Sequence, residues 1–201
     1  MKRKDTYLTL SKDSEGFYKE KGSRFLGFAY VVKDEEQVKE KLAELKKKYY
    51  DARHHCYAYI LGEEGDIFRA NDDGEPGHTA GDPILGQIKS NNLTNTLIVV
   101  VRYFGGTKLG VSGLINAYKT AAADTIANNT IHENLMLTEL KIHFEYALLN
   151  RAMKLVKDYE LEIISQKMEL SCEMILGVRI SLVETIRSKL KDLHEIKVIS
   201  S

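Results

Sequence analysis

Three carboxylates lie within four residues in a polar, glycine-rich stretch that we name the acidic loop, residues 71–81. It reads Asn-Asp-Asp-Gly-Glu-Pro-Gly-His-Thr-Ala-Gly and contains Asp72, Asp73 and Glu75, close to Thr79. Carboxylates this close together could hold a hard cation such as magnesium, or share a proton as an acid/base pair. The alternative, which we favour, is a solvated loop whose Asp and Thr side chains form hydrogen bonds with nearby backbone groups.

A second stretch, the glycine loop of residues 102–113, combines glycines with cations. It reads Arg-Tyr-Phe-Gly-Gly-Thr-Lys-Leu-Gly-Val-Ser-Gly and lies between an apolar run and an expected helix. The first amides of a helix lack intrahelical partners and carry partial positive charge, so glycines there let an anion approach the backbone. We therefore expect Arg102, Lys108 and the amides near Ser112 to receive a phosphate or an acidic side chain. The alternative is that the glycines only permit a tight turn and close packing of the helix on the sheet.

The candidate ligand-binding residues come from these two loops. They are Asp72, Asp73, Glu75, Thr79, Arg102, Tyr103, Gly105, Gly106, Lys108 and Ser112. The glycine loop comes close to the phosphate-binding pattern GxxxxGK[ST], but Val111 stands where lysine is needed, so nucleotide hydrolysis by that mechanism is not expected.

Other residues that could do chemistry are better explained by structure. His54, His55 and Cys56 are adjacent at a strand start, where successive side chains point to opposite faces, so they are poorly placed to act on one substrate. No Ser-His-Asp or Cys-His set can be argued from spacing, because such sets are defined by geometry. We assign no catalytic residue and no metal ligand, and we expect no cofactor.

Periodicity outlines a first domain of mixed strands and helices that positions both loops. Asp34 and Gln37 resemble a capping box, Asp82 followed by Pro83 resembles a helix start, and Ser112 could cap the helix that follows the glycine loop. The apolar run 97–101 predicts a strand buried on both faces. Strands are expected at residues 7–10, 17–19, 25–32, 56–61, 67–70 and 97–101, the first three as a meander, and helices at 34–50, 82–89 and 112–128.

From residue 138 the pattern restarts and predicts a second domain. Leu140, Ile142, Phe144 and Tyr146 alternate with polar residues along one half-buried strand. A helix, two strands, a helix that Ser181 would cap and a last strand follow, and the order βαββαβ suggests a ferredoxin-like sandwich. The two middle strands contain no aromatic side chain, which disfavours an RNA-recognition sheet. We place the domains at residues 1–133 and 134–201.

Composition excludes several classes of protein. Positive and negative side chains number 29 each, so no global basic field exists and any nucleic-acid contact would have to be local. The two cysteines lack the spacing of a zinc or redox motif, and two buried free thiols are expected. No apolar stretch approaches the roughly 20 residues needed to span a bilayer, so we expect a cytoplasmic protein without a membrane partner.

Several motifs resemble the YigZ/IMPACT family. They are Ser23-Arg-Phe25, Ala52-Arg-His-His-Cys-Tyr-Ala-Tyr59, Asp73-Gly-Glu-Pro76, Thr79-Ala-Gly81 and Arg102-Tyr-Phe-Gly-Gly106. The resemblance covers the whole chain, because bacterial YigZ-like members carry a C-terminal ferredoxin-like domain. One departure is that Gly77 and His78 stand where the family usually has Ser-Gly, which excludes a hydroxyl role at residue 77.

The resemblance implies both a fold and a role. The first domain would be similar to the fold shared by a ribosomal small-subunit protein's second domain, elongation factor G's fourth domain and RNase PH, giving an α+β protein overall. Eukaryotic IMPACT proteins oppose activation of the amino-acid-starvation kinase by competing for its activator, and bacterial members are proposed nucleic-acid or ribosome binders. No settled enzymatic activity comes with the family.

Two functions follow as hypotheses. The first is a non-enzymatic, translation-linked regulatory protein that binds RNA, the ribosome or a translation factor through the glycine loop, without DNA sequence specificity. The second is an enzyme in which the acidic loop holds magnesium against a phosphate-bearing substrate.

Overall fold

The computed structural model describes residues 5–193 and 195–199, which separate into two compact units. The first unit comprises residues 7–134, and the second comprises the described residues from 135 onward together with residues 5 and 6. The first unit has two hydrophobic cores and the second unit has one. Among the described helices, none combines the length and apolar character needed to cross a membrane.

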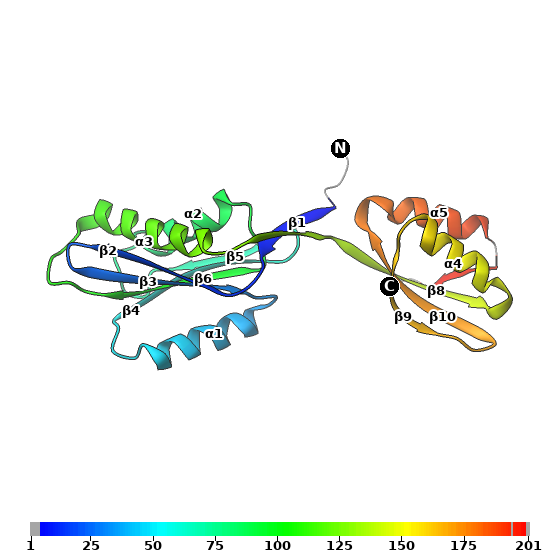
Figure 1. The fold of residues 1–201 in the computed structure, drawn as a ribbon, viewed down its shortest axis with the longest axis horizontal. Helices are drawn as coiled ribbons and strands as arrows, with labels where there is room; N and C mark the ends of the chain where they lie inside the picture. Colours follow the sequence, from blue (N-terminus) through cyan, green and yellow to red (C-terminus); the bar gives the residue numbers. More distant parts are fainter. Residues whose placement is uncertain (1–4, 194, 200–201) are drawn as a thin grey trace. The chain divides into compact units, whose positions relative to one another are not determined.

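A five-stranded antiparallel sheet forms the centre of the first unit (Figure 1). Its strands, in spatial order, are β2 (Ser14–Glu20), β3 (Ser23–Val31), β6 (Thr96–Tyr103), β4 (His54–Leu61) and β5 (Ile67–Asn71). The central position of β6 explains its unbroken apolar sequence, because both of its faces are covered. This confirms the burial predicted from the run 97–101.

Helices cover both faces of this sheet (Figure 1). Helix α1 (Glu35–Lys48) lies on one face, where Val38 and Leu45 share a core with Val99 of β6. Helices α2 (Gly81–Ser90) and α3 (Gly110–Ala127) lie on the other face, where Val100 of β6 is buried. The two cores therefore receive alternate residues of the same strand.

The start of α1 follows the predicted capping chemistry. The Asp34 carboxylate accepts a hydrogen bond from the Gln37 amide at 2.9 Å, as an N-cap residue does. The Gln37 side chain accepts a hydrogen bond from the amide of Lys33, whereas a capping box would use the amide of the N-cap residue Asp34. The helix prediction is confirmed.

Four local details of the first unit differ from the predictions. Strand β1 (Thr6–Leu10) pairs with β7 (Ile131–Leu135) in a separate two-stranded sheet and not with β2, which is an edge strand of the five-stranded sheet. Strand β7 was missed, since all five of its residues are exposed and show no burial period. Asp82 does not cap α2, and Ser112 does not cap α3, which begins at Gly110.

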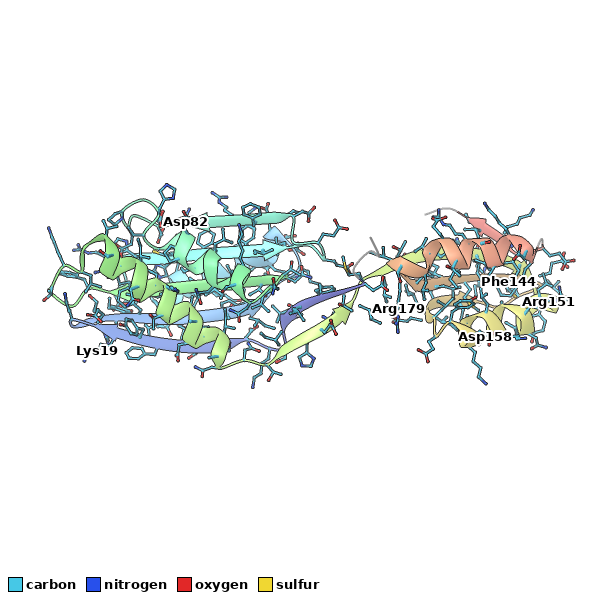
Figure 2. The ribbon with its side chains drawn as sticks, turned by 90° about the horizontal axis from the view of Figure 1, so that it is seen from above. Lys19, Asp82, Phe144, Arg151, Asp158 and Arg179 are labelled. Carbon is cyan, nitrogen blue, oxygen red and sulfur yellow. The ribbon has the colours of Figure 1, made fainter. Side chains whose placement is uncertain are left out.

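The second unit has the predicted element order. It contains β8 (Leu137–Glu145), α4 (Leu149–Asp158), β9 (Glu162–Lys167), β10 (Ser171–Arg179), α5 (Val183–Asp192) and β11 (Lys197–Ile199), in a sheet ordered β11-β8-β10-β9. Leu140, Ile142 and Phe144 are buried as their alternation predicts, and Figure 2 labels Phe144 among the elements of this unit.

Two predictions in the second unit were wrong. Tyr146 is 57% exposed, because β8 ends at Glu145 and the chain turns into a short 3-10 helix. Ser181 does not cap α5, which begins at Val183; its hydroxyl and amide instead bind the Asp5 carboxylate.

Candidate anion-binding groove

Asp72 of the acidic loop binds the loop's own backbone. Its carboxylate accepts hydrogen bonds from the amides of His78, Ala80 and Gly81, each at 2.9 Å. Burial alone would raise the pKa of Asp72, but the three amide hydrogen bonds together hold that pKa below its usual value. Asp72 therefore provides the carboxylate at the start of α2 that Asp82 was expected to provide. Asp82 binds the ring of His78 at 2.7 Å instead.

Glu75 forms a buried ion pair with Arg102. The Arg102 Nη1 and Glu75 Oε1 atoms are 2.5 Å apart, and the two side chains are only 7% and 4% exposed. Glu75 also accepts a hydrogen bond from the Tyr118 hydroxyl at 2.8 Å, and that hydroxyl accepts one from the Cys56 thiol at 3.3 Å. Burial is the main reason that the pKa values of Tyr118 and Cys56 are raised, so both stay protonated at neutral pH.

The remaining candidates of the acidic loop also have internal partners. Asp73 accepts a hydrogen bond from the His55 amide at 2.7 Å and lies 3.5 Å from the Lys46 ammonium. The Thr79 hydroxyl donates to the Pro76 carbonyl at 2.6 Å. Within residues 5–193 and 195–199, no cluster of three or more His, Cys, Asp or Glu side chains could hold a metal ion. The geometry of the acidic loop is thus that of a folded turn.

A groove of about 640 Å³ opens where β4 begins and β6 ends. His54 and Arg102 are directly opposite each other on these two paired strands. Figure 1 shows the start of β4, the end of β6 and the start of α3 at the same end of the sheet. The groove is lined by Asp51, Ala52, Arg53, His54, Arg102, Tyr103, Phe104 and Lys108.

The accessible charge of the groove is positive. Arg53 and Lys108 are exposed, and neither forms an ion pair within the part of the chain that the structure describes. The one acid of the lining, Asp51, accepts a hydrogen bond from the Tyr103 hydroxyl at 2.6 Å. That hydrogen bond is the main cause that raises the pKa of Tyr103 to about 12. Arg53 and Lys108 therefore remain available to an incoming anion.

Arg102 is held at the groove by aromatic rings as well as by Glu75. Its guanidinium lies 5.5 Å from the ring centre of Phe25 and 5.7 Å from that of Phe104. The buried Nε atom has no hydrogen-bond partner among the described residues. Arg102 thus shapes the groove, while its charge is largely balanced by Glu75.

The glycines of the glycine loop have separate roles. The Gly105 amide donates to the Ser23 hydroxyl at 3.1 Å, and a Cβ atom at Gly105 would overlap the backbone of Gly22. Gly106 has a φ of +88° and open space around it. The α3 helix begins without a side-chain cap, so its first amides are not blocked by a capping side chain.

The structure brings together only part of the predicted set. Arg102, Tyr103 and Lys108 line the groove, whereas Ser112 lies in the first turn of α3, exposed and outside the lining. Sequence reasoning missed Arg53 and Phe104 as groove residues. Their signal was weak, because only the pairing of β4 with β6 brings the two segments side by side.

His54 also lines the groove, although a structural role was expected for it. Its Nδ1 atom lies 2.9 Å from the Asp73 carbonyl oxygen, which fixes the ring against the acidic loop. The neighbouring His55 is buried on the opposite face of the strand, and burial lowers its pKa. The expectation that neighbouring histidines face apart is confirmed.

Comparison with known proteins agrees with the motifs. Residues 21–126 match the Impact N-terminal domain. IMPACT family member YvyE of Bacillus subtilis is 36% identical over 73% of this chain and 67% of its own length. An IMPACT family member of Haemophilus influenzae is 32% identical over 86% of this chain and 84% of its own length.

A solved structure extends the likeness to the whole chain. A crystal structure described as a hypothetical protein is 26% identical, with a TM-score of 0.73 over 99% of this chain and 98% of that one. With the family domain matching more than half of the residues and the bacterial relatives matching most of them, the chain belongs to the IMPACT family.

Proposed function

We propose that this protein is a non-enzymatic, translation-linked regulator that binds RNA, the ribosome or a translation factor through the groove beside the glycine loop. One observation carries the proposal: Arg53 and Lys108 line the groove without an ion-pair partner in the described residues. Exposed cations without partners attract anionic ligands, and they release counterions when a polyanion binds. The family resemblance supplies the link to translation and, with it, a cytoplasmic location.

The magnesium-dependent alternative receives less support from the same geometry. An acidic loop that binds magnesium needs carboxylate oxygens directed at one point. Asp72 binds backbone amides, Asp73 binds the β4 backbone and Lys46, and Glu75 binds Arg102. Calorimetric titration with magnesium and a nucleotide tests this alternative, and saturable heat would favour it.

The proposal also includes a specific fold for each unit. The strand order β11-β8-β10-β9 and the element order of the second unit support a ferredoxin-like domain of its own. The first unit, with one helix on one face of its sheet and two on the other, supports the fold proposed from the ribosomal protein, elongation factor and RNase PH resemblance.

The test is binding to purified ribosomes and to structured RNA across a salt series. We expect affinity to fall steeply between 50 and 200 mM salt, as it does for ligands that release counterions, by roughly tenfold or more. Lys108→Ala and Arg53→Ala should each reduce the slope of log affinity against log salt by roughly 1. Lys39→Ala removes an exposed cation of α1 outside the groove and serves as the matched control. An affinity that does not change with salt concentration would contradict the proposal. So would a slope of log affinity against log salt that is unchanged in both groove variants.

A further inference from the structure

Phe104 is an exposed aromatic side chain within a cationic groove. Its side chain is 57% exposed, although burying a phenylalanine would contribute about 1.5–3 kcal/mol to folding. The Arg102 guanidinium, 5.7 Å from the ring centre, and the ion pair of Arg102 with Glu75 fix the surroundings of the ring. Phe104 therefore presents an ordered apolar surface next to positive charge.

The groove has the size of a small-ligand site. Its volume of about 640 Å³ lies within the roughly 300–1,000 Å³ range of sites that enclose single small molecules. One nucleotide fits such a volume. The bases of a duplex are stacked and paired inside, so a duplex would contact this groove only through its phosphates. No base of the duplex would stack on the Phe104 ring.

More exposed cations lie at the same end of the sheet. Gly105 contacts the β2–β3 turn at Gly22, and the Arg24 guanidinium lies 4.9 Å from the ring centre of Tyr103, its partner across β3 and β6. Figure 2 labels Lys19 at this end of the first unit. Apart from Lys46, which pairs with Asp73, the exposed cations of the β2–β3 turn and of the last turn of α1 are Lys19, Lys21, Arg24, Lys47 and Lys48.

None of these five cations forms an ion pair among the described residues, so they form a local basic surface on a chain that has no net charge as a whole. A single strand needs such a surface to follow its phosphates and an aromatic ring on which a base can stack. Both features occur here within one continuous end of the sheet. An acidic protein segment would use the cations but has no need for an exposed ring.

We infer that the groove binds single-stranded RNA, with one unstacked base against Phe104 and its flanking phosphates on Arg53 and Lys108. The strand continues over the β2–β3 turn, where Lys19, Lys21 and Arg24 contact further phosphates. This inference rests on the proposed function and narrows it to one class of ligand. Recognition is tolerant of sequence, because every base has a face that can stack.

The test measures, by fluorescence anisotropy, the affinity of the full chain for a fluorescently labelled 12-nucleotide RNA. The RNA is used once as a single strand and once annealed to its complement, and the two affinities are compared. We expect the single strand to bind about tenfold more tightly than the duplex, because one stacked base contributes roughly that factor. Phe104→Ala should weaken single-strand binding by about tenfold and leave duplex binding unchanged, while Phe104→Tyr retains the affinity.

Phe68→Ala is the matched control. Phe68 is 55% exposed and has the Lys89 ammonium 4.3 Å from its ring centre, but it lies on the edge strand β5, outside the groove. Its substitution should not change binding. Circular dichroism shows whether each variant remains folded.

Three results would overturn the inference and leave the proposed function intact. The first is duplex binding as tight as single-strand binding, and the second is salt-dependent binding that Lys108→Ala weakens but Phe104→Ala does not. The third is equal competition by a polyglutamate peptide of the same charge, which would favour an acidic protein partner. Absence of any binding to RNA or ribosomes would remove both the inference and the RNA and ribosome forms of the proposed function.

Discussion

The acidic loop and the glycine loop look alike in sequence, but only the glycine loop leaves a charged side chain, Lys108, without a hydrogen-bond or ion-pair partner among the described residues. Both are rich in glycine and charge, and both precede a helix on the same face of the sheet. In the acidic loop, Asp72, Asp73 and Glu75 each bind a partner within the chain. In the glycine loop, Lys108 and Gly106 remain open to solvent. The density of charge in a sequence therefore does not distinguish a site from a folded turn.

Backbone geometry explains why the carboxylates of the acidic loop bind partners within the chain. Asp73, Gly74 and His78 all have positive φ values, of 40°, 86° and 65°. Such tight turns expose amides that need acceptors, and the loop's own carboxylates are the nearest acceptors. The glycine loop has its positive φ values at glycines, where no side chain is required to stabilise the turn.

The largest test of this comparison is the free energy of unfolding of Glu75→Ala. Removing one partner of a buried ion pair leaves the Arg102 charge uncompensated, so we expect a loss of about 3–5 kcal/mol in urea denaturation. Lys108→Ala, which removes an exposed charge of the glycine loop, should change stability by about 0.5 kcal/mol or less. Similar losses in the two variants would show that the loops do not differ as described.

A smaller effect should separate two neighbouring glycines of the glycine loop. In Gly105→Ala the new methyl group overlaps the Gly22 backbone, and we expect a loss of about 3 kcal/mol because the β2–β3 turn must shift. Gly106→Ala meets open space and has only the positive φ to accommodate, at a cost of about 1–2 kcal/mol. Thermal unfolding of both variants measures the difference, and the reverse order would contradict the assignment of Gly105 to the fold.

The smallest effect concerns Asp72 and its dependence on pH. The pKa of Asp72 in the folded chain lies below its ordinary value of 3.8, so the ionised carboxylate stabilises the fold above that pH. This stability is lost as the pH falls through the folded pKa. Asp72→Asn should reduce the free energy of unfolding by about 1–2 kcal/mol at pH 7.

The same substitution should flatten the acid dependence. We expect urea denaturation at pH 7, 4 and 3 to show a smaller decrease in stability for Asp72→Asn than for the unaltered chain. Parallel decreases in the two proteins would show that the amides of His78, Ala80 and Gly81 do not depend on the charge of this carboxylate.

The sequence by itself determined the elements whose pattern is local. The apolar run 97–101 predicted a strand covered on both faces, Asp34 predicted the start of α1, and the alternation from Leu140 to Phe144 predicted β8. Each of these signals depends on the fixed period of a strand or on a hydrogen bond between residues near in sequence. Local backbone geometry is enough to decide them.

Only the tertiary structure decided which distant residues meet. In the tertiary structure β1 pairs with β7, and Glu75 forms an ion pair with Arg102. The Asp72 carboxylate accepts hydrogen bonds at the start of α2, and His54 lies opposite Arg102 on the paired strands β4 and β6. A hydrophobic pattern tells which face of a strand is buried but leaves open which strand lies beside it. The groove depends on that second choice, because its cations come from segments that only the pairing of β4 with β6 brings together.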